Sequence, residues 1–258
     1  MNTDTMNMSL HPGGTELTKD AFRTAVKSTA SFRDKKVTLL TEDRRPREEK
    51  ALKILDAGCG VGTSLAALKE EFCIEAYGID SSRASIEKAK ELHSDIHFDA
   101  FDATYLPYNE EYFDGILSEC MLTLLSDPKD AICEWKRVLK TGGFMIISGL
   151  CERNPGDIRY AFRSSFPYDA KSSVICKNGL IDKEALISYA QYLGLVSIYE
   201  KDCREALISY MTDTIMNYGS LEERIKKEQE ATGSSILDCS IKYDPKKISY
   251  VLMIFKKS

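Results

Sequence analysis

The sequence predicts an α/β protein: a Rossmann-like, mostly parallel sheet of seven strands with helices on both faces. Between residues 51 and 150, short apolar segments alternate with segments of helical periodicity, which is typical of a parallel sheet covered on both sides. The first apolar segment runs into the turn Gly58-Cys59-Gly60-Val61-Gly62, and the second ends at Asp80. A strand, a glycine turn, a helix and a second strand that ends in an acid are typical of a site for a nucleotide-type cofactor.

Seven apolar segments have the length of strands, and helical segments separate most of them. The predicted strands cover residues 52–57, 74–79, 96–98, 113–118, 144–148, 195–199 and 249–255. The predicted helices cover residues 64–72, a segment that begins at a Ser81 or Ser82 cap, a segment from Asp127 to Gly142, and a segment from Asp182 to Gly194. Ser and Asp at helix starts accept free N–H groups, and Gly permits a left-handed turn at helix ends. In the second of these helices, Ile86, Ala89 and Leu92 are expected to share the buried face.

Two regions lie outside this alternation. Residues 1–50 form a leader with a helix over 17–27 that starts near Thr15 or Thr18, and the turn cluster His11-Pro12-Gly13-Gly14 lies in front of that helix. Residues 51–258 form the main domain, in which about 201–247 are an insertion with two helical segments between the sixth and seventh strands. The insertion is expected to cap the active site or to form a dimer contact; the alternative is a helical hairpin that only shields the sheet.

Composition limits the class of protein. The 258 residues are 43% hydrophobic and carry a net charge of −5, with acids and bases mixed along the chain. That size fits one domain with elaborations, and the charge argues against nucleic acid or an anionic membrane as the main partner. The N-terminus has no apolar segment typical of a signal peptide, so a cytoplasmic protein is expected. The eight cysteines include no C-x-x-C pair, which favours free thiols and no metal site.

The spacing of the glycine turn distinguishes between cofactors. It is G-x-G-x-G at Gly58, Gly60 and Gly62, whereas the dinucleotide fingerprint is G-x-G-x-x-G. Asp56 lies just before the turn, and a carboxylate there suits a cationic amino group better than a pyrophosphate. S-adenosylmethionine carries an amino acid end, a sulfonium and an adenosine but no phosphate, so it fits this pattern better than NAD.

Segments spread over about residues 50–150 together resemble the motifs of class I S-adenosylmethionine-dependent methyltransferases. The segment that resembles motif I of that family is Leu55-Asp56-Ala57-Gly58-Cys59-Gly60-Val61-Gly62. The later motifs are matched in order and spacing by Asp80, Phe101-Asp102-Ala103, the strand 113–118 and the segment Trp135–Gly143. Among subgroups, the sequence is most similar to the type 11 methyltransferases, which include enzymes of quinone biosynthesis and arsenite methyltransferases. The family also places its seventh strand antiparallel to the others.

The resemblance implies a set of cofactor contacts. Asp56, Gly58 and Gly60 would hold the amino acid end of the cofactor. Asp80 would hold the ribose hydroxyls, and Asp102 would meet the adenine amine. The full set of expected cofactor residues is Asp56, Gly58, Cys59, Gly60, Asp80, Ser81, Asp102, Ala103 and Ser118. In the family a leader often closes over the cofactor as a lid; the alternative here is a surface helix that covers a sheet edge.

Methyl transfer depends on alignment more than on a particular residue type, so the sequence offers only candidates for catalysis. Glu119 follows the fourth strand, where the methyl acceptor is expected, and can serve as a base, a substrate anchor or a cofactor ligand. His11 is the histidine of the leader. Cys120 and Cys176, together with Cys151, suggest a second hypothesis, in which thiolates converge on a soft metalloid such as arsenite. Buried cysteines that only pack are the alternative.

The leading hypothesis is S-adenosylmethionine-dependent methyl transfer to a small molecule. The protein would be a homodimer if the insertion at about 201–247 forms the dimer contact. The leader, residues 150–180 and the insertion are expected to close over the acceptor, and their aromatic content suggests an organic substrate. The other hypotheses are thiol-assisted methylation of a metalloid and a non-catalytic module that binds the cofactor or a partner. The acceptor itself is not fixed by the sequence, because this fold hosts many activities.

Overall fold

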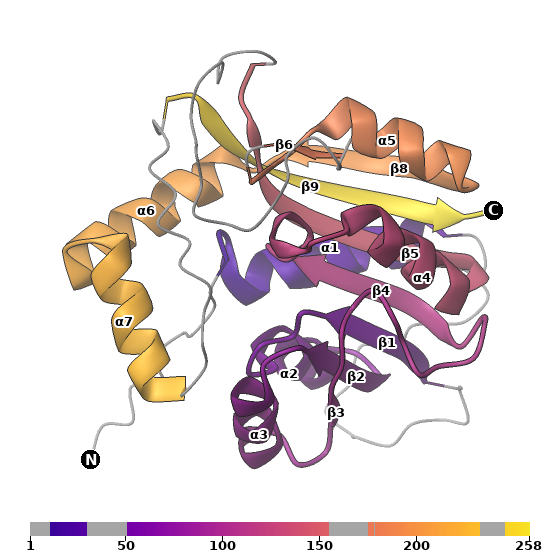
Figure 1. Cartoon of the computed structure of the whole chain (residues 1–258), viewed down its shortest axis with the longest axis horizontal. Coiled ribbons are helices and arrows are strands. Elements are labelled where there is room, and N and C mark those ends of the chain that lie inside the picture. Colours follow the sequence, from indigo (N-terminus) through magenta and orange to yellow (C-terminus); the bar gives the residue numbers. More distant parts are fainter. Residues whose placement is uncertain (1–10, 30–50, 155–174, 178, 233–245) are drawn as a thin grey trace.

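The computed structural model describes residues 11–29, 51–154, 175–177, 179–232 and 246–258, which form one sheet with helices on both faces (Figure 1). Five strands run parallel in the order β3-β2-β1-β4-β5. They are β1 (Leu52–Ala57), β2 (Ile74–Asp80), β3 (His97–Ala100), β4 (Phe113–Glu119) and β5 (Leu139–Glu152). Beyond β5, β9 (Ile248–Lys257) runs antiparallel to it, and β8 (Leu195–Asp202) pairs antiparallel with β9.

All seven predicted strands are present, and two very short strands add to them. β6 (Cys176–Lys177) and β7 (Leu180–Ile181) form an antiparallel pair, and Ile181 pairs with Cys151 of β5. This pairing lies beyond the last partner of β5 in β4, where Ser148 pairs with Glu119. The seven predicted strands are therefore confirmed, and within the described part of the chain the sequence missed only the short β6–β7 pair, because a two-residue strand leaves no apolar pattern in the sequence.

The helices divide between the two faces of the sheet. They are α1 (Gly14–Ser28), α2 (Thr63–Glu71), α3 (Arg83–Leu92), α4 (Pro128–Val138), α5 (Lys183–Tyr192), α6 (Arg204–Tyr218) and α7 (Leu221–Thr232), and a short 3-10 turn, η2 (Leu122–Leu124), follows β4. Side chains of α1, α2, α3 and α6 pack in one hydrophobic cluster, and those of α4 and α5 pack in the other. Neighbouring strand residues alternate between the clusters, as Ile54 and Leu55 do, because successive side chains point to opposite faces.

The chain between β8 and β9 carries α6 and α7, which lie at one end of the molecule (Figure 1). Buried Arg224 of α7 connects the two helices: it donates a hydrogen bond to Thr214 Oγ1 at 2.9 Å and lies over the ring of Tyr210. Within the described ranges, no helix has the length and apolar character needed to cross a membrane.

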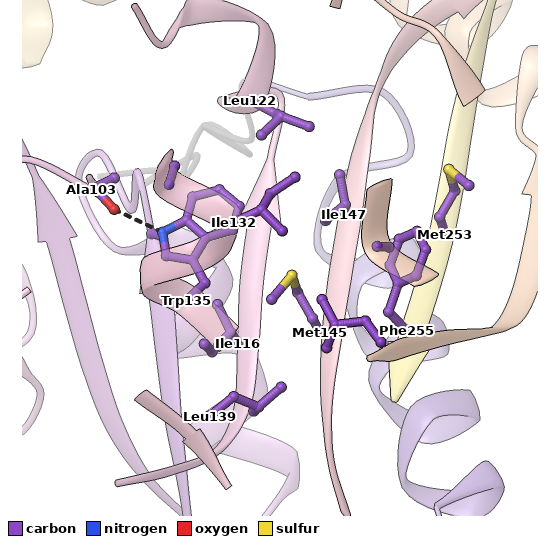
Figure 2. Close-up of a cluster of buried hydrophobic side chains, with 14 of the residues drawn as sticks. Ala103, Ile116, Leu122, Ile132, Trp135, Leu139, Met145, Ile147, Met253 and Phe255 are labelled. Atoms are coloured by element: carbon purple, nitrogen blue, oxygen red, sulfur yellow. Dashed lines mark hydrogen bonds between the residues drawn. The ribbon is translucent and has the colours of Figure 1, made fainter. Parts of the chain in front are cut away.

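The cluster on the α4 side fixes the loop that follows β3. Trp135 of α4 is fully buried in this cluster, together with Ile116 and Met145 from the strands (Figure 2). Its indole N–H donates a hydrogen bond to the carbonyl oxygen of Ala103 at 3.0 Å (Figure 2). Packing in the core therefore holds in place the loop that carries Asp102.

The boundary between α4 and β5 differs from the prediction. α4 begins after an Asp127 N-cap, as predicted, but it ends at Val138 rather than at Gly142. Leu139 already pairs with Phe113 of β4, so the chain enters the sheet earlier than expected. Gly142, with a φ of 81°, lies where the pairing with β4 is interrupted. Gly142 thus lies at a bulge in β5 and does not end the helix.

The ends of α3 and α1 can also be compared with the prediction. Ser82, one of the two predicted caps, caps α3, since its Oγ accepts the N–H of Ser85 at 3.2 Å. The prediction that Leu92 shares the buried face of α3 is wrong: its side chain is 49% exposed, because α3 ends at this residue and the chain turns away. α1 begins at Gly14, next to Thr15, the earlier of the two predicted starts, so the helix continues directly from the glycine turn of the leader.

Candidate active site

The carboxyl ends of the parallel strands bring the predicted cofactor residues to one edge of the sheet. The glycine turn follows β1, Ser81 follows β2, and Ser118 lies near the end of β4. The chain leaves β1 toward β2 on one side, whereas β4 lies on the other side of β1. The edge between β1 and β4 is therefore a topological switch point, where open α/β sheets bind their ligands.

The glycine turn is held against the end of β2 and needs glycine at its first position. The N–H groups of Gly58 and Cys59 both donate to the carbonyl oxygen of Ile79, at 2.8 and 2.9 Å. Gly58 has a φ of 90°, and a Cβ there would lie 2.4 Å from Cγ of Met121. Any side chain at this position would strain the backbone and overlap the segment that follows β4. The glycine thus lets the two loops of the switch point approach each other.

The acids at the ends of β2 and β3 are held by neighbouring backbone groups. The half-buried Asp80 carboxylate accepts the N–H of Gly60 at 3.0 Å and that of Ser82 at 2.8 Å, so it joins the glycine turn to the start of α3. The exposed Asp102 carboxylate accepts both the N–H and the hydroxyl of Thr104, at 2.8 Å each. The other predicted residues of this region are the exposed Ser81 and the buried Cys59 and Ala103. Oriented carboxylates of this kind suit ligand groups that donate hydrogen bonds, such as ribose hydroxyls.

Two buried polar side chains at the switch point have no partner among the described residues. Asp56 of β1 is 3% exposed, and its carboxylate makes no hydrogen bond or ion pair in those ranges. Burial, and then the charges of Glu119 and Asp80, raise the pKa of Asp56 well above its ordinary value. Ser118 Oγ is fully buried and equally unpaired within the described chain. Such groups are costly to bury, and a ligand that brings a positive charge or a donor would satisfy them.

Glu119 lies at the end of β4 and connects the leader to the core. Thr18 Oγ1 of α1 donates a hydrogen bond to its Oε1 at 2.8 Å, and Ser64 Oγ of α2 donates to its Oε2 at 2.7 Å. His11 Nε2 lies 3.4 Å from the same Oε2. The side chains of Glu119 and His11 are only 6% and 9% exposed. Residues 11–29 of the leader therefore pack onto the switch point through a buried polar network.

Two consecutive glycines turn the leader so that His11 faces Glu119. Gly13 and Gly14 have φ values of 84° and 55°, in the left-handed region that favours glycine. A Cβ on Gly13 would lie 2.7 Å from the side chain of Leu17 in α1, so the turn is closely packed as well. The structure thus brings together His11 and Glu119, two of the four predicted catalytic candidates.

The other two candidates, Cys120 and Cys176, lie on opposite faces of the sheet. The sulfur of Cys120 lies 3.4 Å from the hydroxyl of Tyr250, which belongs to the cluster on the α1 side. Cys176 and Cys151 belong to the cluster on the α4 side, and burial raises the pKa of each thiol to about 12. The predicted convergence of the three sulfurs is therefore wrong. Among the described residues, no group of three or more His, Cys, Asp or Glu side chains is arranged to hold a metal ion.

The sequence prediction missed Thr18 and Ser64, the two hydroxyl partners of Glu119. Thr18 lies on the buried face of α1 with Ala21 and Phe22. Ser64 lies on the buried face of α2 with Leu65. A polar residue on an otherwise apolar helix face is the signal that could have singled out both positions.

Comparison with known proteins concerns mainly the central part of the chain. Residues 55–147 match the family described as a methyltransferase domain. An uncharacterized protein of Haemophilus influenzae is 33% identical over 102 residues, which are 36% of this chain and 41% of that protein. The O-methyltransferase cnsE of Penicillium expansum is 31% identical over 119 residues, which are 42% of this chain and 43% of that protein. The chain thus spans about two fifths of the length of these curated relatives.

A solved structure shows that the likeness of fold extends over most of the chain. The structure of geranyl diphosphate methyltransferase in complex with S-adenosylmethionine has a TM-score of 0.61 and covers 93% of this chain and 85% of its own, at 14% identity. None of these matches separates the quinone-biosynthesis and arsenite subgroup from others, so that finer assignment stays a prediction. The chain therefore has the class I, Rossmann-like methyltransferase fold, and its residues 55–147 are similar to the methyltransferase domain family.

Proposed function

We propose that this chain transfers a methyl group from S-adenosylmethionine to a small-molecule acceptor. The observation that carries the proposal is the buried carboxylate of Asp56, which lies beside the glycine turn without a partner in the described chain. S-adenosylmethionine has an ammonium group and a sulfonium, so it would bring positive charge to such a carboxylate. A pyrophosphate-containing cofactor would bring negative charge to the same edge, which already carries Asp80 and Glu119.

The residues along the edge fit the parts of this cofactor in order. We assign Asp56 and the backbone of Gly58 and Gly60 to its amino acid end. We assign Asp80 to the ribose, since its carboxylate is already oriented by two backbone N–H groups. Asp102 is assigned to the adenine amine, in a loop that Trp135 holds in place. The proposed set is completed by Cys59, Ser81, Ala103 and the unpaired Ser118.

The chemistry asks little of the protein beyond alignment. The cofactor supplies a methyl group that is already activated by the positive sulfur, so the chain has to hold donor and acceptor in line. The end of β4 and the leader helix α1 supply the wall on which we place the acceptor, with Glu119 and His11 as its polar groups. The names of the relatives, an O-methyltransferase and a geranyl diphosphate methyltransferase, favour a small-molecule acceptor. The separated cysteines give no support to a thiol-assisted reaction on a metalloid.

Calorimetric titration of the reduced protein with S-adenosylmethionine and with S-adenosylhomocysteine tests the proposal. We expect micromolar binding of both ligands. In Asp80→Ala the affinity should fall by about 100-fold, because the variant loses the ribose acceptor and the link between the glycine turn and α3. Asp95→Ala is the matched control: it removes a carboxylate that faces Lys69 in the segment before β3, at the opposite edge of the sheet. No binding of either ligand would overturn the proposal and favour a module without this chemistry.

A further inference from the structure

Four acids follow one another along the carboxyl edge of the sheet. Their order matches the order of the strands: Asp102 after β3, Asp80 at the end of β2, Asp56 in β1 and Glu119 at the end of β4. In the proposed function the adenosine lies over β3 and β2. The cofactor sulfur is bonded to the C5′ carbon of the ribose, so it would lie next along the edge, toward β1 and β4. Asp56 and Glu119 are therefore the acids that flank the reacting end of the cofactor.

The charge of Glu119 is held in place without being neutralised by lysine or arginine. Its contacts in the described chain are the hydroxyls of Thr18 and Ser64, which are neutral donors, and the imidazole of His11. His11 can offset the charge only when it is protonated. Neutral hydroxyl donors fix the carboxylate oxygens in space, and a carboxylate retains capacity for a further favourable contact. Glu119 is thus a positioned anion that can attract a cation.

Asp56 adds a second acidic side chain on the same side of the sheet. In β1, Ile54 belongs to the cluster on the α1 side, and Asp56 lies two positions further along the strand, so it faces that side too. In β4, Leu117 belongs to the same cluster, and Glu119 is placed likewise. Burial is the main cause of the raised pKa of Asp56, and the nearby charge of Glu119 raises this pKa further. The reacting end of the site is therefore short of positive charge.

We propose that Glu119 is a specificity-determining residue that makes the site prefer the positively charged sulfonium of the methyl donor over the neutral thioether of the product. The inference rests on the proposed function. It follows because the two ligands share their amino acid and adenosine ends and differ at the sulfur by one methyl group and one unit of charge. A carboxylate in a poorly hydrated environment gains far more from a nearby cation than from a neutral sulfur. The same residue would therefore favour departure of the product after each transfer.

The test compares three ligands on Glu119→Gln by calorimetry at neutral pH. The ligands are S-adenosylmethionine, S-adenosylhomocysteine and sinefungin, whose amine places a positive charge near the position of the sulfonium. In Glu119→Gln we expect the affinity for the two charged ligands to fall by about fivefold or more, and that for S-adenosylhomocysteine by less than about twofold. Glutamine keeps one carbonyl acceptor, which serves one of the two hydroxyls of Thr18 and Ser64, and the other hydroxyl can rotate to accept from the new NH2 group.

Two further variants separate charge from position. Asp102→Asn removes the same charge at the adenine end, so it should change the affinity for all three ligands alike. Glu119→Asp retains the charge and should restore much of the preference for charged ligands, even if Glu119→Gln folds poorly. An equal loss for all three ligands in Glu119→Gln, or an unchanged ratio of affinities, would overturn the inference and leave Glu119 as an anchor for the leader. If the wild-type protein binds none of the ligands, the proposed function itself fails.

Discussion

The acids at the carboxyl ends of β2 and β3 differ in burial and in hydrogen-bond partners from the acids at the ends of β1 and β4. At the ends of β2 and β3, Asp80 and Asp102 are partly or fully exposed and accept hydrogen bonds from neighbouring backbone N–H groups. At the ends of β1 and β4, the side chains of Asp56 and Glu119 are buried. Asp56 has no partner within the described ranges, and Glu119 is held by hydroxyls from two helices. Local backbone geometry organises the first half, whereas packing between distant segments organises the second.

The β2–β3 half therefore supplies oriented acceptors for a ligand, and the β1–β4 half supplies buried acids that favour a positively charged ligand. Backbone N–H groups two residues further along the chain orient Asp80 and Asp102 in the protein alone. Asp56 and Glu119 instead pay a desolvation cost that a cationic ligand would relieve. We therefore expect the β2–β3 half to decide whether adenosine binds. The β1–β4 half should make cofactor affinity depend on pH, through Asp56, and on the contact between Glu119 and the leader helix α1.

Gly58→Ala should have the largest effect, because it breaks the contact between the loops of β1 and β4. An alanine would be strained at a φ of 90°, and its Cβ would overlap the Met121 side chain, at 2.4 Å from Cγ. We expect a loss of about 3 kcal/mol in the free energy of unfolding. Binding of S-adenosylhomocysteine should no longer be detectable. Urea denaturation and calorimetry measure the two effects.

Gly60→Ala is the matched control for the same turn. Gly60 also has a positive φ, 53°, but a Cβ there would meet no atom within 4 Å. Only the backbone strain remains, so the expected loss is about 1 kcal/mol. Equal losses in the two variants would contradict the role given to the contact between Gly58 and Met121.

Asp56→Asn tests whether burial of Asp56 disfavours its charged form in the folded protein. A folded-state pKa above the unfolded value means that the folded protein keeps a proton that the unfolded chain releases. This carboxyl therefore stabilises the fold at low pH, and the contribution is lost as the pH rises from about 4 toward the folded-state pKa. Asparagine removes this dependence. Relative to wild type, the free energy of unfolding of Asp56→Asn should be higher at about pH 8 than at about pH 5, by about 1 kcal/mol or more.

Urea denaturation of the ligand-free proteins at the two pH values measures this difference, with Asp95→Asn as the control. A hydrogen bond from Lys69 lowers the pKa of Asp95, so the contribution of Asp95 changes only below about pH 4. Asp95→Asn should therefore differ from wild type by the same amount at both pH values. If Asp56→Asn behaves in the same way, Asp56 carries no penalty for its burial, and the contrast between the two halves disappears.

The site residues at the ends of β2 and β3 could be predicted from the sequence, because they follow their strands at short, fixed sequence distances. The glycine turn, Asp80 and Asp102 occupy fixed offsets after apolar strands, and the parallel order of those strands brings their ends to one edge. The caps Asp127 and Ser82 were predictable for the same reason, since each satisfies N–H groups within its own helix. The fold class rests on such local signals repeated along the chain.

The second half could be predicted only in part, because its contacts join segments far apart in the sequence. Glu119 and His11 were singled out as separate candidates, but no spacing rule connects either of them to Thr18 or Ser64. The metalloid hypothesis predicted that the three cysteines meet, because each follows a strand or precedes a helix, whereas its alternative was that they only pack. Cys120 packs on the α1 side and Cys176 on the α4 side, and sequence position alone does not give the face.

Thr18→Val should have the smallest effect and tests how firmly the leader is held. Thr18 is buried, and its hydroxyl donates to Glu119 across the interface between α1 and β4. Valine has nearly the same shape and removes only the donor, so the expected loss is about 1 kcal/mol in the free energy of unfolding. In Thr24→Val, which removes a hydroxyl bonded to the Asp20 carbonyl within the same helix, the loss should be below about 0.5 kcal/mol. Urea denaturation compares the two variants, and faster hydrogen exchange of α1 amides in Thr18→Val alone would show that this hydroxyl anchors the leader. Equal exchange in both variants would mean that apolar packing holds α1, and that the buried hydroxyls serve only to orient Glu119.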